Sequence, residues 1–281
     1  MATLTRLYAL STIALTAHAG VREAVAYLEQ EVPRWRRENK CFSCHNNGDG
    51  ARALFAAMSR GLPVKRDAVQ DTVDGLLRPS DWEPKTLATV QYASALAMAV
   101  DAKLVSDAAA VDRVAEAVAK AQAPDGHWQV EEEKSTGAPA TYGPDIGTAL
   151  ALSIMDRANK RDSGNRARLW LSSRNPASVL TAAAVLMAGI RKPEAVATLA
   201  RLQHSDGSWE HEPFDTAVAI LGLEKAKAEP TAIARGRAWL LRAQSESGGW
   251  AATTRPPGGD SYAQHISTTA WATLALLEMR E

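Results

Sequence analysis

Three copies of one turn motif constrain the fold of this chain more than any other feature. The copies read EAVAKAQAPDGHW at 116–128, ATLARLQHSDGSW at 197–209 and AWLLRAQSESGGW at 238–250. In each, an apolar-periodic helix is followed by Gln, an acidic or Ser-rich turn, Gly and Trp. The second and third Trp residues are 41 positions apart, and the first and second are 81 apart, close to two such steps. A period of this length is typical of folds in which one helical unit packs on the next.

Each residue type of the motif has a physical reason. The Gln can reach the free carbonyl groups at the end of its helix, and the Gly permits a tight turn. The Trp can then hold the turn against a neighbouring helix by burying a large ring. A small, apolar second helix follows each copy, as in GTALALSIM at 147–155.

The rest of the chain follows the same two-helix rhythm, and few β-branched alternations indicate a strand. The Ala-rich second helices suit a crowded inner ring, and the charged first helices suit the outside. The sequence therefore predicts an all-α protein, an (α/α)6 toroid of alternating inner and outer helices in one domain over 20–281, with an open solenoid as the alternative. The six expected units pair helices 21–37 and 51–60, 66–77 and 86–100, 107–122 and 145–158, 164–173 and 177–189, 193–203 and 214–225, and 231–244 and 262–280.

The pattern QxxDGxW at Gln122–Trp128 and Gln203–Trp209 resembles the QW repeat of squalene–hopene and oxidosqualene cyclases. It is shared more loosely with protein prenyltransferases. The resemblance covers nearly the whole chain after residue 19 and implies the same (α/α)6 toroid. It also implies a terpenoid-binding or terpenoid-modifying enzyme that uses the central cavity, although a fold alone does not carry a function.

The chain departs from the cyclase pattern where the chemistry would start. Such cyclases protonate an alkene with a DxDDTA stretch, and the nearest match here is EPFDTA at 212–217, with Phe214 in place of the proton donor. Asp215 in this stretch and Asp145 at the matching place of unit three remain weak catalytic candidates, with helix capping as the simpler interpretation. Only 6% of residues are aromatic, few for a cavity that stabilises carbocations. Proton-initiated cyclisation and zinc-dependent prenyl transfer are therefore disfavoured.

Both cysteines of the chain lie in the stretch ENKCFSCHNNGDG at 38–50. Cys41, Cys44 and His45 form the Cys-x-x-Cys-His signature of covalent haem c, in which two thiols add to the vinyl groups and His45 ligates the iron. We expect the motif in a loop at 41–45, on the rim that carries the Gly-Trp turns in other units. His265 and Met58 are the candidate second iron ligands. Zinc binding, a dithiol–disulfide redox pair and a loop without chemistry are the alternatives.

The first nineteen residues are consistent with an export signal. Arg6 precedes an apolar run at 7–17, and an A-x-A cleavage pattern follows at 17–19. The alternative is an ordinary helix that packs on the core. Haem c is attached outside the cytoplasm in bacteria, so a signal peptide at 1–19 and a periplasmic or secreted location agree with the haem interpretation.

Bulk properties exclude some partners. Lys plus Arg and Asp plus Glu both number 32, whereas a nucleic-acid-binding protein would need a basic excess. No apolar run reaches the roughly 18 residues of a membrane span.

Three functional hypotheses follow. The first is a secreted redox protein with one covalent haem, which passes electrons to a partner protein or acts on a small molecule at the ring mouth. The second is the terpenoid-modifying enzyme, and the third is a non-catalytic interaction scaffold. The long loops at 123–144 and 251–261 lie on the expected binding rim, where Tyr142 and Arg255 could line a pocket.

Overall fold

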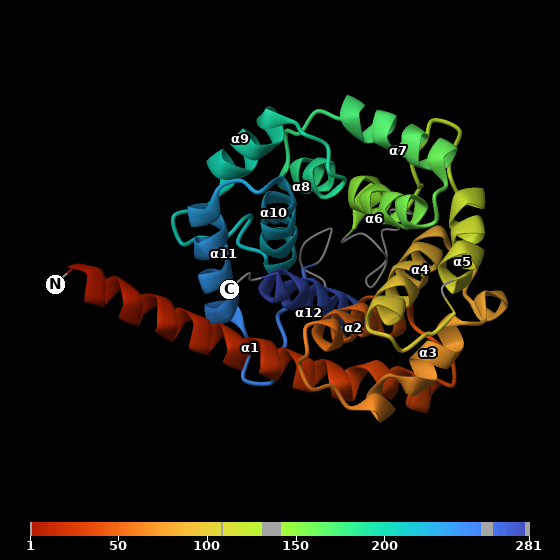
Figure 1. The fold of residues 1–281 in the computed structure, drawn as a ribbon, viewed down its shortest axis with the longest axis horizontal. Coiled ribbons are helices and arrows are strands. Elements are labelled where there is room, and N and C mark those ends of the chain that lie inside the picture. Colours follow the sequence, from red (N-terminus) through yellow and green to blue (C-terminus); the bar gives the residue numbers. More distant parts are fainter. Residues whose placement is uncertain (1, 108, 131–141, 254–260, 279–281) are drawn as a thin grey trace.

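This computed structural model describes residues 2–107, 109–130, 142–253 and 261–278, with side chains from residue 19 onward. The described part contains twelve α-helices, one short π-helix and two short 3-10 helices. The helices form a closed ring with one set inside the other (Figure 1). The predicted (α/α)6 toroid is confirmed.

Six helices line the inside of the ring. They pack side by side in chain order, and the last packs against the first. Their faces are buried nearly all round, as expected for a helix without a polar side; α10, for example, buries every residue from Pro213 to Ile220. The inner helices are α2 (Ala51–Ser59), α4 (Thr86–Asp101), α6 (Gly143–Arg157), α8 (Val179–Met187), α10 (Pro213–Ala226) and α12 (Tyr262–Leu277).

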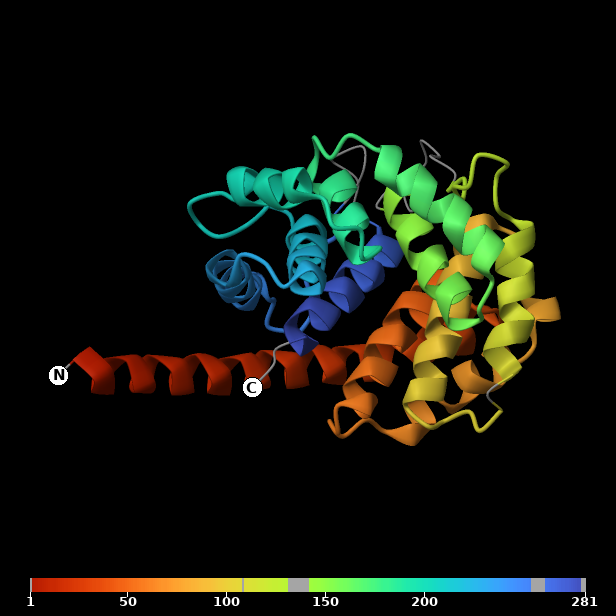
Figure 2. The ribbon, with the colours of Figure 1, turned by 45° about the horizontal axis from the view of Figure 1, so that its top comes forward.

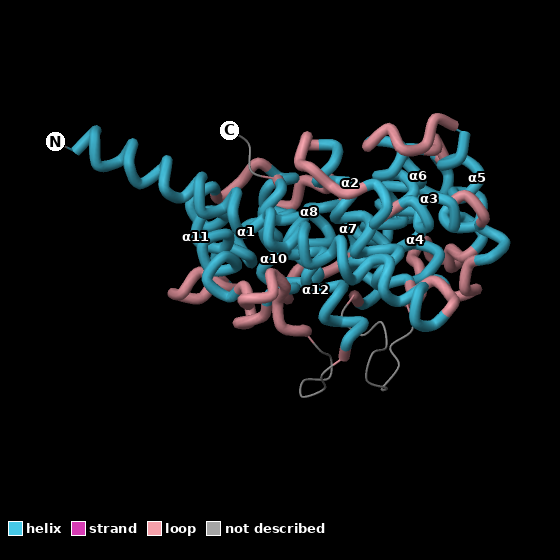
Figure 3. The backbone as a smooth tube through the Cα atoms, turned by 90° about the horizontal axis from the view of Figure 1, so that it is seen from below, coloured by secondary structure: helices cyan, strands magenta, loops and turns pink. Residues whose placement is uncertain are grey.

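Six helices surround this inner set (Figure 1). They are amphipathic: α5, for example, buries Ala110, Val111, Val114, Ala115 and Val118 and leaves its opposite face polar. Because each outer helix returns the chain, the inner helices all run in the same direction and their N-termini share one rim; Figure 3 shows the loops of both rims. The outer helices are α1 (Ala2–Asn39), α3 (Gln70–Leu76), α5 (Ala109–Lys120), α7 (Arg161–Ser173), α9 (Pro193–Leu202) and α11 (Pro230–Ala243).

The repeated turns use the bonds that their composition suggests. Each Trp of the motif is fully buried, and its indole N–H donates to a carbonyl of the preceding outer helix at 2.7–2.8 Å. Each Gln side chain donates to the Gly carbonyl of its own turn and also to a backbone carbonyl of the next outer helix. The last Gln, Gln244, reaches Gly20 in α1 at 2.8 Å, so the same bond that joins neighbouring units also closes the ring.

Most predicted helix boundaries differ from the structure by a few residues, and two differences matter for the shape of the chain near the cysteine motif. The first helix was expected to begin at residue 21, but α1 is continuous from Ala2, and its N-terminal part extends away from the ring (Figure 2). The cysteine motif was expected to be a loop, but it is one only up to Ser43: Cys44–Gly50 is a π-helix that leads directly into α2. His45 therefore stands at the start of an inner helix rather than on a free loop. Among the described residues, no helix is both long and apolar enough to cross a bilayer.

Candidate functional site

Ser43 begins the helical part of the cysteine motif. Its hydroxyl accepts hydrogen bonds from the backbone N–H groups of His45 and Asn46 at 3.3 and 3.4 Å, and the Asn47 side chain in turn accepts from the Ser43 N–H at 3.0 Å. This reciprocal arrangement satisfies N–H groups that a helix start leaves without partners. The residue between the two cysteines thus fixes where the helix starts, a role that the pattern Cys-x-x-Cys-His does not reveal.

Two buried asparagines anchor the motif to its surroundings. Asn46 donates to the Glu31 carbonyl of α1 at 2.8 Å and to the Tyr262 hydroxyl of α12 at 2.9 Å. Asn47 donates to the Thr72 hydroxyl of α3 at 2.8 Å. The segment is therefore fixed by contacts with three other helices, which suits a group that must be held in one orientation.

Asp49 is the hub of a buried polar network. The Ser267 hydroxyl of α12 and the Gln91 amide of α4 each donate to its Oδ2 at 2.8 Å, and the Tyr142 hydroxyl donates to its Oδ1. Arg52 supplies the opposite charge, with its Nη2 3.7 Å from Oδ1. The carboxylate is fully buried and acts as acceptor to donors from three separate elements, so it ties the inner helices together at this level.

His45 is connected to this hub through Ser267. Its Nδ1 lies 2.7 Å from the Ser267 hydroxyl. Because that hydroxyl gives its proton to Asp49, its lone pair accepts the His45 Nδ1–H, which assigns the proton of the neutral ring to Nδ1. Burial lowers the pKa of His45, against a weaker opposite effect of Asp49 and Glu83. At neutral pH the ring is therefore neutral, and Nε2 carries a lone pair with no hydrogen-bond partner among the residues that the structure describes.

Three aromatic rings fill the ring interior beside this network. The ring centroids of Tyr142, Phe214 and Trp271 lie 5.4–5.9 Å apart in all three pairs, and each side chain is almost fully buried. The Arg52 guanidinium lies 4.2 Å from the Trp271 centroid, and the Trp271 indole donates to the Tyr142 hydroxyl at 2.7 Å. Phe214, the residue in place of the expected acid, thus packs in an aromatic cluster next to a buried cation.

The two cysteines have different environments. Cys41 is exposed and Cys44 is half-buried, and neither forms a disulfide. Burial, with a smaller effect of Asp49 and Glu83, raises the pKa of the Cys44 thiol to about 12, so it is protonated at neutral pH. Among the described residues, no three His, Cys, Asp or Glu side chains are grouped so that they could hold a metal ion.

Of the weaker sequence candidates, Asp145 has its described bonds outside the cluster. Asp145 accepts from Arg174 at 3.0 Å and from Thr181 at 2.6 Å, which ties α6 to the end of α7 and to the first turn of α8. Asp215 is buried in the first turn of α10. Asp145 and Asp215 were expected to cap their helices, but the N-cap residue is Tyr142 for α6 and Glu212 for α10. The expected cap positions were therefore wrong.

The two candidate second iron ligands lie on opposite rims of the ring. Met58 is in the last turn of α2, remote from His45. His265 is in the first turn of α12, on the rim of His45. His265 is two residues before Ser267, and side chains two positions apart in an α-helix point in directions about 200° apart. His265 is therefore not on the helix face that meets His45. Tyr142 was expected at the ring mouth but is buried, and Arg255 lies outside the described residues.

The comparisons with solved structures identify the fold. The type II terpene cyclase MstE from Scytonema superposes with a TM-score of 0.60 at 16% identity, over 93% of this chain and 97% of that chain. The chain has the fold of a type II terpene cyclase. A variant of MstE in complex with merosterolic acid A, its product, superposes on the same fold with a TM-score of 0.62 at 16% identity, over 96% and 98% of the two chains.

Sequence comparison adds one short match. Over 69 residues, the chain is 41% identical to drimenyl diphosphate synthase from Streptantibioticus cattleyicolor. The match covers 22% of this chain and 13% of that synthase, so this chain spans only a small part of it. No family model matches the chain.

Proposed function

We propose that this protein binds a terpenoid and modifies it by proton transfer, without the acid that starts alkene-protonating cyclisation. The likeness to MstE carries the proposal, because it extends over nearly all of both chains and one of the two structures holds a terpenoid product. The short match to drimenyl diphosphate synthase supports the same substrate class.

The cluster suggests which group would take part. His45 is neutral, and its Nε2 is available as a proton acceptor, the usual role of a poised imidazole. After it accepts a proton, its Nδ1–H still donates to Ser267, and Ser267 still donates to the Asp49 carboxylate. These two hydrogen bonds stabilise the imidazolium and fix its orientation. The aromatic cluster with Phe214 leaves no acid at the position where the cyclases carry their proton donor.

The test is incubation of the purified protein with farnesyl diphosphate, geranylgeranyl diphosphate and squalene, followed by mass spectrometry of a solvent extract. We expect binding of at least one compound and its conversion. His45→Gln keeps a hydrogen-bonding group near Ser267 but removes the base, so conversion should fall on the order of 100-fold or more while binding persists. His204→Gln, on the surface turn before Trp209, is the matched control. Absence of terpenoid binding in the wild type would contradict the proposal.

A second candidate function is electron transfer by a haem bound to Cys41 and Cys44, with His45 on the iron. One observation favours it. His45 Nδ1 is connected through the Ser267 hydroxyl to the Asp49 carboxylate, and Nε2 is available. Metal-ligating histidines commonly have this arrangement. Cys41 is exposed and Cys44 half-buried, and thiols that are not fully enclosed support covalent attachment of a porphyrin, which would supply one-electron chemistry. This function requires export, as residues 1–19 suggest.

The haem proposal has a separate test. The protein is produced with the haem-maturation machinery, and its visible spectrum and intact mass are measured beside those of Cys41→Ala. A Soret band that survives acid-acetone extraction, and a mass increased by one porphyrin in the wild type, are the expected results. A wild-type protein without added porphyrin mass would rule this function out and leave the terpenoid proposal intact.

A further inference from the structure

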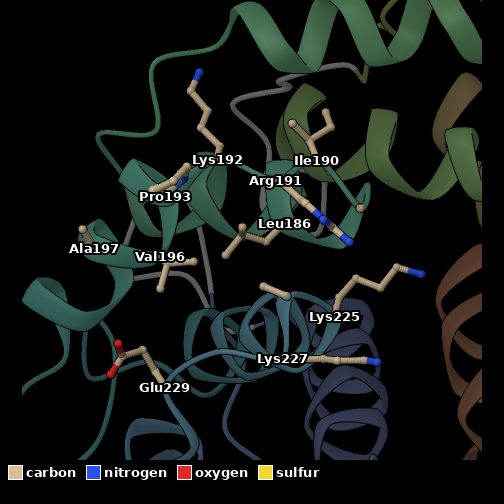
Figure 4. A pocket seen from close by; sticks show the side chains of 12 residues that line it. Leu186, Ile190, Arg191, Lys192, Pro193, Val196, Ala197, Lys225, Lys227 and Glu229 are labelled. Atoms are coloured by element: carbon tan, nitrogen blue, oxygen red, sulfur yellow. The ribbon is translucent and has the colours of Figure 1, made fainter.

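A cavity of about 700 Å³ opens on the rim opposite to His45. Its walls come from the ends of α8 and α10 and from the starts of α9 and α11 (Figure 4). Since the inner helices run in the same direction, their C-terminal ends lie on the rim away from the cysteine motif. Neither the terpenoid proposal nor the haem proposal uses this cavity, and its volume is in the range of sites for single small molecules.

The middle of the cavity is apolar. Leu186 is buried and Val196 half-buried, and in Figure 4 they lie in the centre of the pocket, with Pro193 nearby. Burial of an alkyl chain here would contribute roughly 25 cal/mol for each Å² of apolar surface removed from water. The cavity therefore suits a ligand with an apolar body.

One end of the cavity is strongly basic. Arg191, Lys225 and Lys227 all line it and are exposed, and in Figure 4 their charged ends extend in the same direction, away from Glu229. None of the three has an ion-pair partner within the described part of the chain. In a protein of zero net charge, three unpaired cations at one cavity mouth are a local excess that an anion would neutralise.

Helix dipoles explain only part of this charge. Lys225 and Lys227 lie at the C-terminal end of α10, where a cation is favourable. Arg191 instead lies two residues before the start of α9, where a cation is unfavourable. Lys192 beside it has a structural role, because its ammonium donates to the carbonyls of Ser172 and Arg174. Arg191 has no such role among the described contacts.

The helix starts add donors to the same cavity. Both α9 and α11 begin there with Pro, and neither has a side-chain capping bond. Free backbone N–H groups in a first helical turn favour an anion. In Figure 4, however, Pro193 and Glu229 lie on the side of the cavity away from the charged ends of Arg191, Lys225 and Lys227, so the three cations, and not the helix starts, define the end that an anion would occupy.

We infer that this cavity binds a single anionic amphiphile, an organic phosphate or diphosphate with an apolar chain. The head group would lie among Arg191, Lys225 and Lys227, and the chain would cover Leu186 and Val196. A concave cavity of this size fits one molecule, whereas a membrane would require a broad, outward-facing surface.

The test is calorimetric titration with farnesyl diphosphate and with dodecyl phosphate, both below their micelle-forming concentrations. We expect both to bind, and binding to weaken with added salt because the cations are exposed. The double variant Lys225→Gln/Lys227→Gln should raise each Kd at least 10-fold. Ala197→Glu, which places a carboxylate on an exposed position of the cavity wall, should weaken binding as well.

The control is Lys103→Gln. Lys103 is exposed and unpaired among the described contacts. It follows α4 with φ 58°, as Lys227 follows α10 with φ 54°, and α4 lies in another part of the ring than α8 and α10 (Figure 1). Its substitution should leave both Kd values unchanged. Equal binding of inorganic diphosphate, unchanged Kd values in the double variant, or binding only to phosphatidylglycerol vesicles would overturn the inference.

Discussion

Asp49 shows how much one residue can depend on its neighbours. It is the single acceptor for Ser267, Gln91 and Tyr142 and the counter-ion of Arg52. In the sequence it is one acidic residue in the Gly-rich run HNNGDG, and sequence reasoning passed over it in favour of the cysteines. The only available signal was that Asp49 and Arg52 are charged residues within a stretch that otherwise begins an apolar helix.

Asp49→Asn is therefore predicted to destabilise the protein strongly. The amide has one acceptor oxygen instead of two and leaves Arg52 buried without a counter-ion, which should cost about 3–5 kcal/mol. Urea unfolding followed by circular dichroism measures the change. The control is Asp67→Asn at an exposed position, which should stay within about 0.5 kcal/mol of the wild type. Equal effects of the two substitutions would show that the network contributes little.

His45 is predicted to make stability depend on pH. Its pKa in the folded protein is lowered from 6.5 by burial. Below about pH 6.5 the unfolded chain takes up a proton that the folded protein excludes, so the free energy of unfolding falls as pH decreases, by up to about 1.4 kcal/mol per pH unit until the folded pKa is reached.

The measurement is unfolding of wild type and His45→Gln, made without haem, at pH 5 and pH 7. Other histidines contribute equally to both proteins, so the difference between the two pH dependences isolates His45. We expect the wild type to lose more stability at pH 5 than the variant. Parallel pH dependences would mean that this imidazole is protonated in the folded protein.

At the scale of elements, the repeated turns explain why the helical units could be located from the sequence. Gln, Gly and Trp each make the same bonds in the three copies, and most of these bonds lie within the motif or reach the next helix. Local patterns of this kind are readable in a sequence. The π-helix at Cys44–Gly50, directly before α2, was missed because it depends on distant partners such as Glu31 and Thr72.

The turn glycines give an element-scale prediction. Gly207 has φ 99°, and an added Cβ would lie 2.6 Å from the Arg235 carbonyl oxygen of α11. Gly207→Ala should therefore shift the neighbouring outer helix. It should lower the free energy of unfolding by more than the penalty for a left-handed backbone alone, which is about 1–2 kcal/mol. Gly61→Ala is the matched control, because Gly61 has φ 77° and nothing within 4 Å of the added Cβ. Thermal unfolding of both variants tests this; equal shifts in Tm would contradict it.

For the whole molecule, closure of the ring is the decisive feature. An open solenoid has end units that contact one neighbour only, whereas here α12 packs on both α10 and α2 and α1 packs on α12. No unit is then free to unfold first, and a single cooperative transition is expected.

Closure predicts that Gln244→Ala and Gln203→Ala have similar effects. Each removes a bond to a backbone carbonyl of the next outer helix, to Gly20 and to Ala232 respectively, both at 2.8 Å. Gln203→Ala also removes the acceptor of the exposed Arg235 side chain. Each should lower stability by about 1–2 kcal/mol, and fluorescence and circular dichroism should report the same urea midpoint. A negligible effect of Gln244→Ala, or separate midpoints, would indicate that the ring opens between α11 and α1.

The sequence by itself determined the all-α toroid, because apolar periodicity, Ala-rich inner helices and the recurring Gln-Gly-Trp turn are local properties. It also pointed to the segment that starts with Cys41 and ends at His45. Only the tertiary structure decided how His45 is held, because Asp49, Gln91, Tyr142 and Ser267 are up to 218 residues apart in the chain and meet only when the ring closes. The basic cavity has the same origin: Arg191 and Lys225 belong to different units, and no local pattern records that the ends of α8 and α10 face each other.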